Sequence, residues 1–457
     1  MIAVRTLVAE LAALMGAAGG LRSWLGRRAG AAVRQGMTTI ADQGVVSMTN
    51  FLTGVIVARC CSRAELGLYS LGFSVVLLLT SAQTYLVSVP YNVYCMRVPA
   101  GERSAYTGST LVHQMVMSVA SVALLGSVLL LLSPGAGVQG FGPVLSMLAL
   151  TIAFTLAREY GRQLFFSRLR FASVLLLDIA VAVLQLAALL WLAHVGRLSA
   201  RAAFAVTGAT SAVAVLLWVL PARRLVELVP GRVLAAFQMN WVIGRWSLAA
   251  GLATVAGTLL YPWFIAASRG ADQAGTLAAC TGITALTNPL VIGMGNFLAP
   301  RITHAFAEGG ASAVQRVTRA ALLAFGAIMS FMCPALFLGG GELLKLVYGV
   351  RYAGHGLTVG LLSLALVADW LSLPAHHALL LMERADVTFK SNLIEVLVTV
   401  TLGFALVTEF GAIGAAIGLL VGHSLATLFK WREYRKGMGS WLPGDVVIAG
   451  PASGTGS

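Results

Sequence analysis

Long apolar segments recur along almost the whole chain and are separated by short polar connections. A transmembrane helix needs roughly 20 apolar residues, because the hydrocarbon core of a bilayer is about 30 Å thick and each helical residue rises about 1.5 Å. The pattern therefore predicts an all-α membrane protein with about twelve transmembrane helices. The expected helices cover residues 38–58, 65–88, 106–132, 141–166, 170–195, 199–221, 241–265, 274–299, 313–338, 355–380, 387–408 and 411–431.

The longest connection lies midway along the chain and divides the apolar segments into six and six. Weak self-similarity accompanies this division: residues 64–68 (AELGL) follow the first segment, and residues 272–276 (DQAGT) follow the seventh. An even number of helices in each repeat gives parallel repeats, related by an axis along the membrane normal. We therefore predict two six-helix halves around a central cavity.

The predicted organisation also includes polar segments at both ends. Glu10 interrupts the apolar part of the first 36 residues, and arginines follow where a signal peptide would need a cleavage site. We expect this stretch to lie at the membrane surface. The full division is a cytoplasmic lead-in (1–36), an N-terminal half (37–221), a cytoplasmic linker (222–240), a C-terminal half (241–436) and a cytoplasmic flexible tail (437–457).

The basic residues alternate in density from one connection to the next. About 24 of the 31 lysines and arginines fall in connections that share one side of the membrane, and about 7 fall on the other side. Cytoplasmic connections carry the excess of basic residues. The distribution predicts a multi-pass protein of a bacterial cytoplasmic (inner) membrane with both termini in the cytoplasm.

Composition and motifs exclude several classes of function. The net charge is +14, but the basic residues are spread over short connections without interleaved aromatics, so we expect contact with the lipid bilayer and no nucleic-acid partner. The sequence contains no G-x-x-x-x-G-K-[ST] phosphate loop, no H-E-x-x-H pair and no nucleophile elbow. Its five cysteines show no metal-ligand spacing. We expect no enzyme activity, no cofactor and no metal site.

Four acidic residues fall inside the predicted spans: Asp42, Asp178, Asp369 and Glu395. A charged side chain at the bilayer centre costs at least about 2.5–3.5 kcal/mol on insertion scales, so none of the four should face lipid. They are candidates for coupling transport to protons or sodium. The alternative is that they form ion pairs that hold helices together.

Several arginines stand near the ends of predicted spans. Arg158 and Arg162 are one helical turn apart and share a face, while Arg59, Arg245 and Arg301 occupy other span ends. Guanidinium groups bind phosphate through bidentate hydrogen bonds. Together, they would suit a diphosphate headgroup at an inner vestibule. For any single arginine, anchoring at the cytoplasmic surface remains the alternative.

Glycine and proline mark expected breaks in two spans. The eighth span contains Asn288-Pro289, Gly293, Gly295, Asn296 and Pro300, and Pro90 with Asn92 is expected to end the second span. Breaks free backbone groups that lipid cannot satisfy, and corresponding breaks in two halves indicate a transport pathway. Asn288 and Asn296 therefore join the candidate substrate-binding residues. A kink that only aids packing is the alternative.

Four stretches carry a resemblance to a known family. Residues 50–59 (NFLTGVIVAR) and 64–71 (AELGLYSL) resemble the first two helices of Wzx-like bacterial polysaccharide flippases, in the multidrug/oligosaccharidyl-lipid/polysaccharide (MOP) exporter superfamily. Residues 288–301 resemble the eighth helix of that group, and residues 343–349 (LLKLVYG) resemble the segment before the tenth. The layout agrees over nearly the whole chain, although each motif is loose.

The resemblance implies a fold and a function. The expected cargo is an oligosaccharide repeat unit on undecaprenyl diphosphate, moved from the inner to the outer leaflet by alternating access without ATP hydrolysis. Such a protein is often coupled to an ion gradient and serves polysaccharide biosynthesis, where a polymerase is a possible partner. The resemblance extends a cavity role to Arg59 and Arg301, which lie in the matching stretches.

Three other classes of protein compete with this interpretation. A multidrug exporter of the same superfamily would share the fold but would need an acidic cavity for cations. A major-facilitator transporter would carry a glycine-acid-arginine signature in the second connection, which reads RVPAGER at residues 97–103. A membrane enzyme of polysaccharide assembly needs a large outer loop, and the longest expected one, near residues 339–354, is short. Lipid II flippases carry two further helices that this sequence does not predict.

Overall fold

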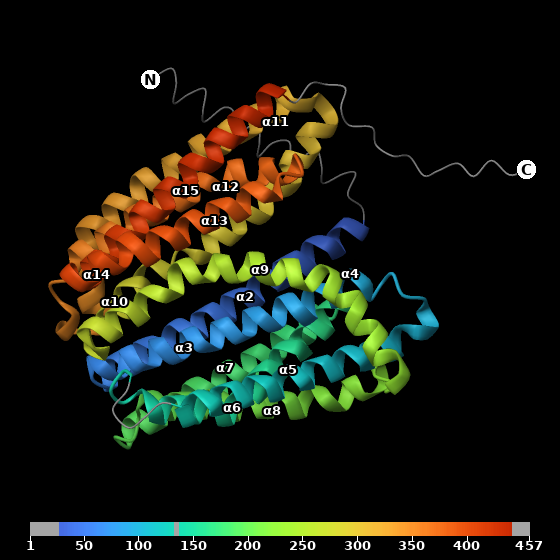
Figure 1. Cartoon of the computed structure of the whole chain (residues 1–457), viewed down its shortest axis with the longest axis horizontal. Helices are drawn as coiled ribbons and strands as arrows, with labels where there is room; N and C mark the ends of the chain where they lie inside the picture. Colours follow the sequence, from blue (N-terminus) through green and yellow to red (C-terminus); the bar gives the residue numbers. More distant parts are fainter. Residues whose placement is uncertain (1–26, 132–136, 441–457) are drawn as a thin grey trace, which may run out of the picture.

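The computed structural model describes residues 27–131 and 137–440, and within these ranges the regular structure is entirely helical (Figure 1). The predicted lead-in and tail therefore lie largely outside the described residues. The first half contains α2 (Arg27–Cys60), α3 (Arg63–Gln83), the π-helix η1 (Thr84–Ser88), α4 (Val89–Tyr94), the 3₁₀ turn η2 (Ala100–Glu102), α5 (Arg103–Leu131), α6 (Phe141–Ser167), α7 (Phe171–His194), α8 (Ala200–Ala222) and the 3₁₀ turn η3 (Arg223–Leu225).

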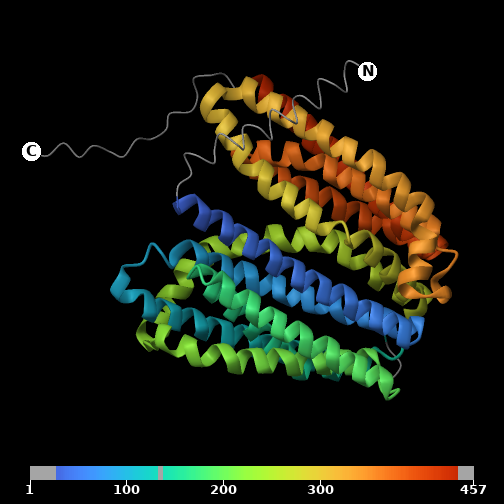
Figure 2. The ribbon, with the colours of Figure 1, turned by 180° about the vertical axis from the view of Figure 1, so that it is seen from behind.

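The second half is built in the same way but has longer helices. It contains α9 (Pro230–Arg269), α10 (Ala271–Ala285), α11 (Asn288–Tyr348), the 3₁₀ turn η4 (Val350–Tyr352), α12 (Gly356–Leu381), α13 (Ala385–Val398), the π-helix η5 (Thr399–Gly403), α14 (Phe404–Phe410) and α15 (Ala412–Ser440). Two bundles result, one with α2, α3 and α5–α8 and one with α10–α15 (Figures 1 and 2). Helix α9 runs along their boundary: it packs against α5 and η1 on one side and against α10, α13 and α14 on the other.

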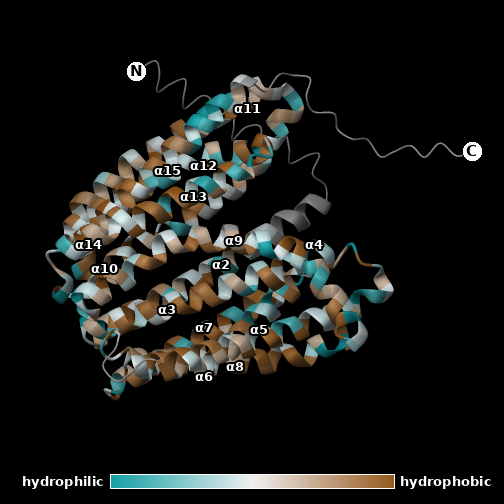
Figure 3. Cartoon of the chain, viewed as in Figure 1, coloured by the Kyte–Doolittle hydropathy of each residue, from teal (hydrophilic) through white to brown (hydrophobic). Residues whose placement is uncertain are grey.

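Within the described residues, eleven helices are long and apolar enough to cross a membrane, which agrees with the predicted membrane fold. The prediction of about twelve crossings differs because α11 has 61 residues, or about 90 Å of helix. Its backbone leaves helical geometry at Gly309 and Gly310, where Gly310 has φ +59° and the chain turns back. The first arm of α11 together with α10 matches the predicted eighth span, and its second arm matches the ninth. Polar residues gather mainly towards the helix ends (Figure 3).

The expected break at Asn288-Pro289 of the eighth span is present, whereas the expected interruptions further along that span and the end of the second span at Pro90 are not. The eighth span breaks between Ala285 and Asn288, and α11 then continues through Gly293, Gly295 and Pro300. Proline in the first turn of α11 costs no hydrogen bond, because the N–H groups of that turn have no helical partner. The second span does not end at Pro90. It continues to Tyr94 because η1 widens the helix just before the proline, which sits in the first turn of α4.

The two bundles meet at one end of the molecule, where α3 crosses α10. A Cβ added to Gly67 would lie 1.8 Å from the Ala271 carbonyl oxygen, and one added to Gly275 would lie 1.9 Å from the Arg63 carbonyl oxygen. Both pairs of counterparts are 208 positions apart (275 − 67 and 271 − 63). The contact is thus reciprocal, as between copies related by a two-fold axis. This geometry favours the predicted duplication with parallel repeats.

We call this end, around Arg59, Arg63 and Gly67, the closed end. The Arg63 guanidinium lies 3.2 Å from the Asp272 carboxylate across the two bundles. Arg59 donates from Nε to the Val347 carbonyl at 2.7 Å and from Nη2 to the Leu346 carbonyl. Arg351 donates to the Cys61 carbonyl. From this end the bundles splay apart towards α4 and the far ends of α11 and α15 (Figure 1).

Two adjacent cysteines at the closed end allow the predicted orientation to be tested. Cys60 is exposed, whereas Cys61 is buried, and burial raises the pKa of the Cys61 thiol to about 11. Cys61 is therefore almost entirely in the unreactive thiol form at neutral pH. We expect a membrane-impermeant maleimide to label Cys60 on intact spheroplasts, and Cys60→Ala to remove the signal. Labelling of Cys60 only after cell lysis would reverse the predicted orientation.

Candidate functional site

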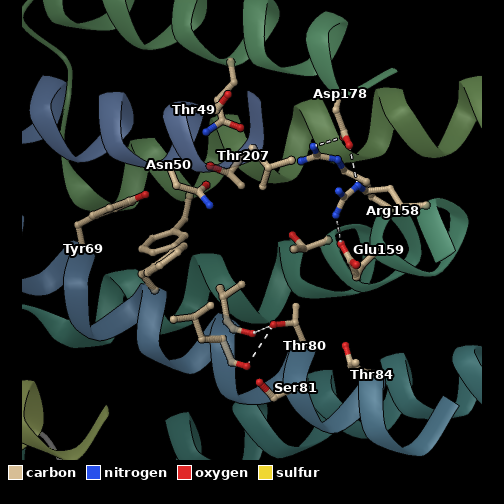
Figure 4. A pocket seen from close by; sticks show the side chains of 18 of the residues that line it. Thr49, Asn50, Tyr69, Thr80, Ser81, Thr84, Arg158, Glu159, Asp178 and Thr207 are labelled. Carbon is tan, nitrogen blue, oxygen red and sulfur yellow. Dashed lines mark hydrogen bonds and ion pairs between the residues drawn. The ribbon is translucent and has the colours of Figure 1, made fainter. Parts of the chain in front are cut away.

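A cavity of about 280 Å³ lies in the N-terminal half, bordered by α2, α3, η1, α6, α7 and α8 (Figure 4). We call it the polar cavity. Its hydroxyl and amide side chains are Thr49, Asn50, Thr80, Ser81, Thr84, Thr155, Gln185 and Thr207. Thr49, Thr80 and Thr207 each donate their hydroxyl hydrogen to a carbonyl of their own helix. The lone pairs of these oxygens therefore remain able to accept hydrogen bonds from a polar ligand.

A buried ion cluster forms one wall of the polar cavity. Arg162 bonds three carboxylates: Asp178 from Nε at 2.6 Å, Glu159 from Nη1 at 2.8 Å and Asp42 from Nη2 at 2.8 Å. Arg158 donates from Nη2 to the second oxygen of Asp178 at 2.6 Å. We call these five residues the N-terminal ion cluster. Its charge-assisted bonds join α2, α6 and α7, and its two cations and three anions sum to one negative charge.

This geometry bears on four of the predicted site residues. Asp178 and Asp42 have side chains that are 0% and 2% exposed, and each is paired with arginine rather than open to an ion. The alternative role, joining helices, is the one that the contacts of these two acids favour. All three guanidinium nitrogens of Arg162 are occupied, so it offers little to a phosphate. Arg158 lines the cavity, and its Nε is buried without a hydrogen-bond partner among the described residues.

A second cavity, also about 280 Å³, lies between the two halves, bordered by α3, α9, α10, α12 and α15. We call it the apolar cavity. Phe73 and Leu77 of α3 line both cavities, so the two are neighbours across one helix. Of its sixteen lining side chains nine are apolar and five are serine or threonine, and His423 is the imidazole in its wall. Helix α3 therefore separates the polar cavity from the apolar cavity.

Four ionisable side chains lie near one another in the C-terminal half: Asp369, Glu395, His423 and Lys430. We call them the C-terminal charge cluster. The His423 Nδ1 atom lies 3.5 Å from the Glu395 Oε1 atom. Asp369 and Lys430 are close enough to His423 to act on it electrostatically. Lys430 is only 7% exposed and reaches the Ser372 hydroxyl at 3.4 Å.

The structure thus brings two predicted acids together with two residues that the sequence analysis did not select. His423 and Lys430 are seven positions apart in the last span, hence on one face of α15. An ionisable residue inside an apolar span is a functional signal by itself, and this rule applied to the last span would have identified both.

The remaining arginines do not join the polar cavity. Arg59 lies about 25 Å along α2 from Asp42 and caps carbonyls at the closed end, away from the polar cavity, so its role at an inner vestibule stays a prediction. Arg245 is exposed beside the Trp246 ring, 5.4 Å from its centroid. Arg301 stacks on the Phe297 ring at 4.6 Å. These contacts supply surface packing, and a phosphate role for Arg245 or Arg301 stays a prediction.

The two predicted asparagines lie in the first arm of α11. Asn288 is exposed where the helix begins, directly after the break that follows α10. The side chain of Asn296 lies outside the described residues. Asn288 lines neither the polar nor the apolar cavity.

No protein-family description and no curated protein sequence matches this chain. Solved structures of transporters do match it, with probability 1.00. An inward-facing multidrug resistance MATE family transporter of the MOP superfamily aligns with a TM-score of 0.71 and 13% identity, over 88% of this chain and 96% of that one. The lipid II flippase MurJ in an inward closed conformation aligns with a TM-score of 0.68 and 13% identity, over 88% and 89%.

A third solved structure aligns with a lower score. An outward-facing MATE family transporter aligns with a TM-score of 0.63 and 14% identity, over 90% of this chain and 96% of that one. The value is lower than for the inward-facing transporter. At such low identity the likeness concerns the fold. The chain is an all-α membrane protein with the fold of MOP superfamily transporters.

Proposed function

We propose that this protein is a flippase that moves undecaprenyl-diphosphate-linked oligosaccharide repeat units from the inner to the outer leaflet of a bacterial cytoplasmic membrane. Transport would proceed by alternating access without ATP hydrolysis and would serve surface polysaccharide biosynthesis. The observation that carries the proposal is the polar cavity, whose ligand groups are hydroxyls, amides and arginine-paired acids. A likeness in fold to the lipid II flippase MurJ supports it.

The chemistry of the cavity suits a sugar. Sugars present many hydroxyl donors, and the threonine oxygens and the Asn50 amide are acceptors for them. Sugar rings also have apolar faces, and the rings of Tyr69, Phe73 and Phe204 border the same cavity. Arg158 lines the cavity wall and brings to it a guanidinium group, which is a hydrogen-bond donor suited to phosphate oxygens. The polyprenyl chain needs no site in the protein, because the bilayer itself dissolves it.

The conformation fits a state ready to accept cargo from the cytoplasm. The excess of basic residues favours an orientation with the closed end at the outer surface. The ion pair of Arg63 with Asp272 and the Gly67–Gly275 contact would then seal the outer side. The splayed ends of the bundles would face the inner leaflet, where lipid-linked repeat units are made.

An ion-coupled multidrug exporter is the second candidate, and two observations favour it: the TM-score of 0.71 to the inward-facing MATE transporter and the acids of the C-terminal charge cluster. A cationic drug needs an unpaired acid, because opposite charge supplies most of its binding energy in a desolvated pocket. In the polar cavity, Asp178 and Glu159 both bond an arginine. Because each of these acids is paired with an arginine, the lipid-linked oligosaccharide is the better-supported cargo.

Asn50→Leu is expected to reduce flipping of lipid-linked oligosaccharide about tenfold or more, because loss of a buried polar contact to a ligand costs about 1.5 kcal/mol or more. Flipping can be measured in proteoliposomes from the fraction of labelled lipid-linked oligosaccharide that becomes accessible in the outer leaflet. Gln43→Leu is the matched control, since it removes an amide from the same helix outside the cavity. Equal rates in the two variants would remove the polar cavity from the mechanism.

A further inference from the structure

His423 occupies a position that the transport proposal leaves unexplained. It lines the apolar cavity between the halves, and it belongs to the C-terminal charge cluster. Counted along α15 it lies about 16 Å from the end that begins at Ala412, which places it near the middle of the membrane. Transport proteins hold their coupling ions at this depth, where two halves meet. A buried imidazole at this depth has a structural or a proton-carrying role.

We propose that His423 is a proton-binding residue that, together with Glu395, couples this transporter to protons rather than to sodium. The inference rests on the proposed transport function, and it names the ion, the site and the residue that binds it. Three features of the molecule support it: the packing that holds His423 in place, the balance of charge around it, and a set of ligands that is unsuited to a metal cation.

Packing of α15 against α12 fixes the orientation of His423. The residues His423, Thr427 and Lys430 recur every three or four positions and thus form one stripe of α15. Thr427 donates to the Ala368 carbonyl at 2.7 Å, and Lys430 reaches Ser372. These two contacts direct the whole stripe, including His423, towards α12 and the neighbouring helix α13.

The contact between the imidazole and Glu395 is longer than a strong hydrogen bond. Its Nδ1 atom is buried and lies 3.5 Å from Glu395, yet it has no hydrogen-bond partner among the described residues. A strong charge-assisted bond would be about 2.7–2.9 Å long. A proton on Nδ1 would shorten and strengthen this contact. His423 also lines the apolar cavity, from which a proton can arrive.

The balance of charge favours a single added proton. Among the elements packed around His423, α12 contributes Asp369, α13 contributes Glu395, and α15 itself contributes Lys430. From α9, Tyr261 borders the same cavity, and α10 contributes only neutral hydroxyls to it. His376 is close enough to Lys430 to interact with it electrostatically and does not line the cavity. With a neutral imidazole the cluster carries one net negative charge, and protonation makes it neutral, which lowers the cost of burial.

The same groups are unsuited to sodium. A hard cation requires several oxygen ligands, and each must approach it without a competing positive charge. Here, the Lys430 ammonium already occupies the cluster, and an imidazole nitrogen faces Glu395. No group of three or more metal-ligating side chains occurs among the described residues. A proton needs only one lone pair, and His423 supplies it.

The local backbone offers a way to transmit protonation. Glu395 lies just before η5, a π-helical turn within the eleventh span. Thr399 bonds both the Glu395 carbonyl and the Gly257 carbonyl of α9, at 2.8 and 2.9 Å. π-helical turns commonly mark functional adjustments of a helix. A shift of Glu395 towards His423 therefore moves α13 relative to α9, which borders both halves.

The test follows the charge state of His423 directly in the full-length protein in lipid nanodiscs. Histidine side chains are labelled with ¹⁵N, and the His423 signal is assigned by its loss in His423→Gln. We expect this signal to change between pH 5 and pH 8. Glu395→Gln should displace the change by about one pH unit or more, a tenfold change in proton affinity. Glu433→Gln, at a carboxylate paired with Arg384 near the helix end, is the control and should not displace it.

Each outcome decides the proposal. A His423 signal that does not titrate overturns it, as does a titration that Glu395→Gln leaves in place. A shift of the signal when sodium chloride replaces choline chloride at constant pH and ionic strength would make sodium the bound ion and overturn it as well. This readout does not use the cargo. Titration as predicted in a protein that flips no lipid-linked oligosaccharide would refute the proposed cargo and leave the proton site standing.

Discussion

Gly275→Leu is expected to abolish transport, because the closed end cannot form with a side chain at this position. A Cβ atom at Gly275 would lie 1.9 Å from the Arg63 carbonyl oxygen and 3.0 Å from the Gly67 nitrogen. Both neighbours are backbone atoms, so no side-chain rotation relieves the clash. Helices α3 and α10 must separate, and the overpacking costs at least about 1–3 kcal/mol. The state that seals this end is then lost from the transport cycle.

Exposure of Cys280 reports on this separation. Cys280 lies on α10 and is 0% exposed, so it should resist alkylation in the wild-type protein and react in Gly275→Leu. Gly67→Leu should have the same effect, because its Cβ would lie 1.8 Å from the Ala271 oxygen. Gly126→Leu on α5 is the matched control, since nothing lies within 4 Å of the added Cβ. Normal transport with a protected Cys280 in Gly275→Leu would contradict the close helix contact.

Arg162→Leu is expected to destabilise the protein by about 3–5 kcal/mol, because it leaves Asp42 and Asp178 buried without their common cation. The free energy of unfolding, measured by denaturant titration in detergent, should show this loss. Arg232→Leu provides the control. Arg232 pairs with Glu102, and both side chains are about half exposed, so its removal should cost about 1 kcal/mol or less.

A second substitution separates charge from packing at the same position. If the cost arises from uncompensated charge, Asp42→Asn should restore part of the stability of Arg162→Leu, because it removes one buried anion. If the cost arises from lost packing alone, the two substitutions should add. Equal destabilisation by Arg162→Leu and Arg232→Leu would show that the N-terminal ion cluster contributes no more than a surface pair.

The transmembrane helices could be predicted because each segment must itself be apolar enough to cross the bilayer, whatever helices it packs against. Each crossing needs enough apolar residues, and this requirement is visible in the composition of a single segment. The turn at Gly309 and Gly310 separates the eighth and ninth crossings, as predicted. The end expected at Pro90 is wrong because the cost of that proline depends on whether the preceding turn can widen into a π-helix, and composition does not report that.

The candidate site could be predicted only in part, because it depends on pairing between distant helices. The acids are recognisable from their cost in lipid, but the pairing of Asp42 with Arg162 needs α2 and α6 to lie side by side. The spacing of residues along the chain does not show which helices are neighbours. The same limit applies to Arg59: its position at a span end is clear from the sequence, but its carbonyl partners lie almost 290 residues away in α11. His423 is detectable by the same rule as the acids, because an imidazole inside an apolar span is also ionisable.

The most direct test of the proposed function is the leaflet distribution of the cargo in a strain that lacks this gene. The proposal predicts that undecaprenyl-diphosphate-linked oligosaccharide accumulates on the cytoplasmic face, with shortened surface polysaccharide that the gene restores. Unchanged distribution of this lipid, together with raised sensitivity to cationic drugs, would contradict the proposal and identify a multidrug exporter.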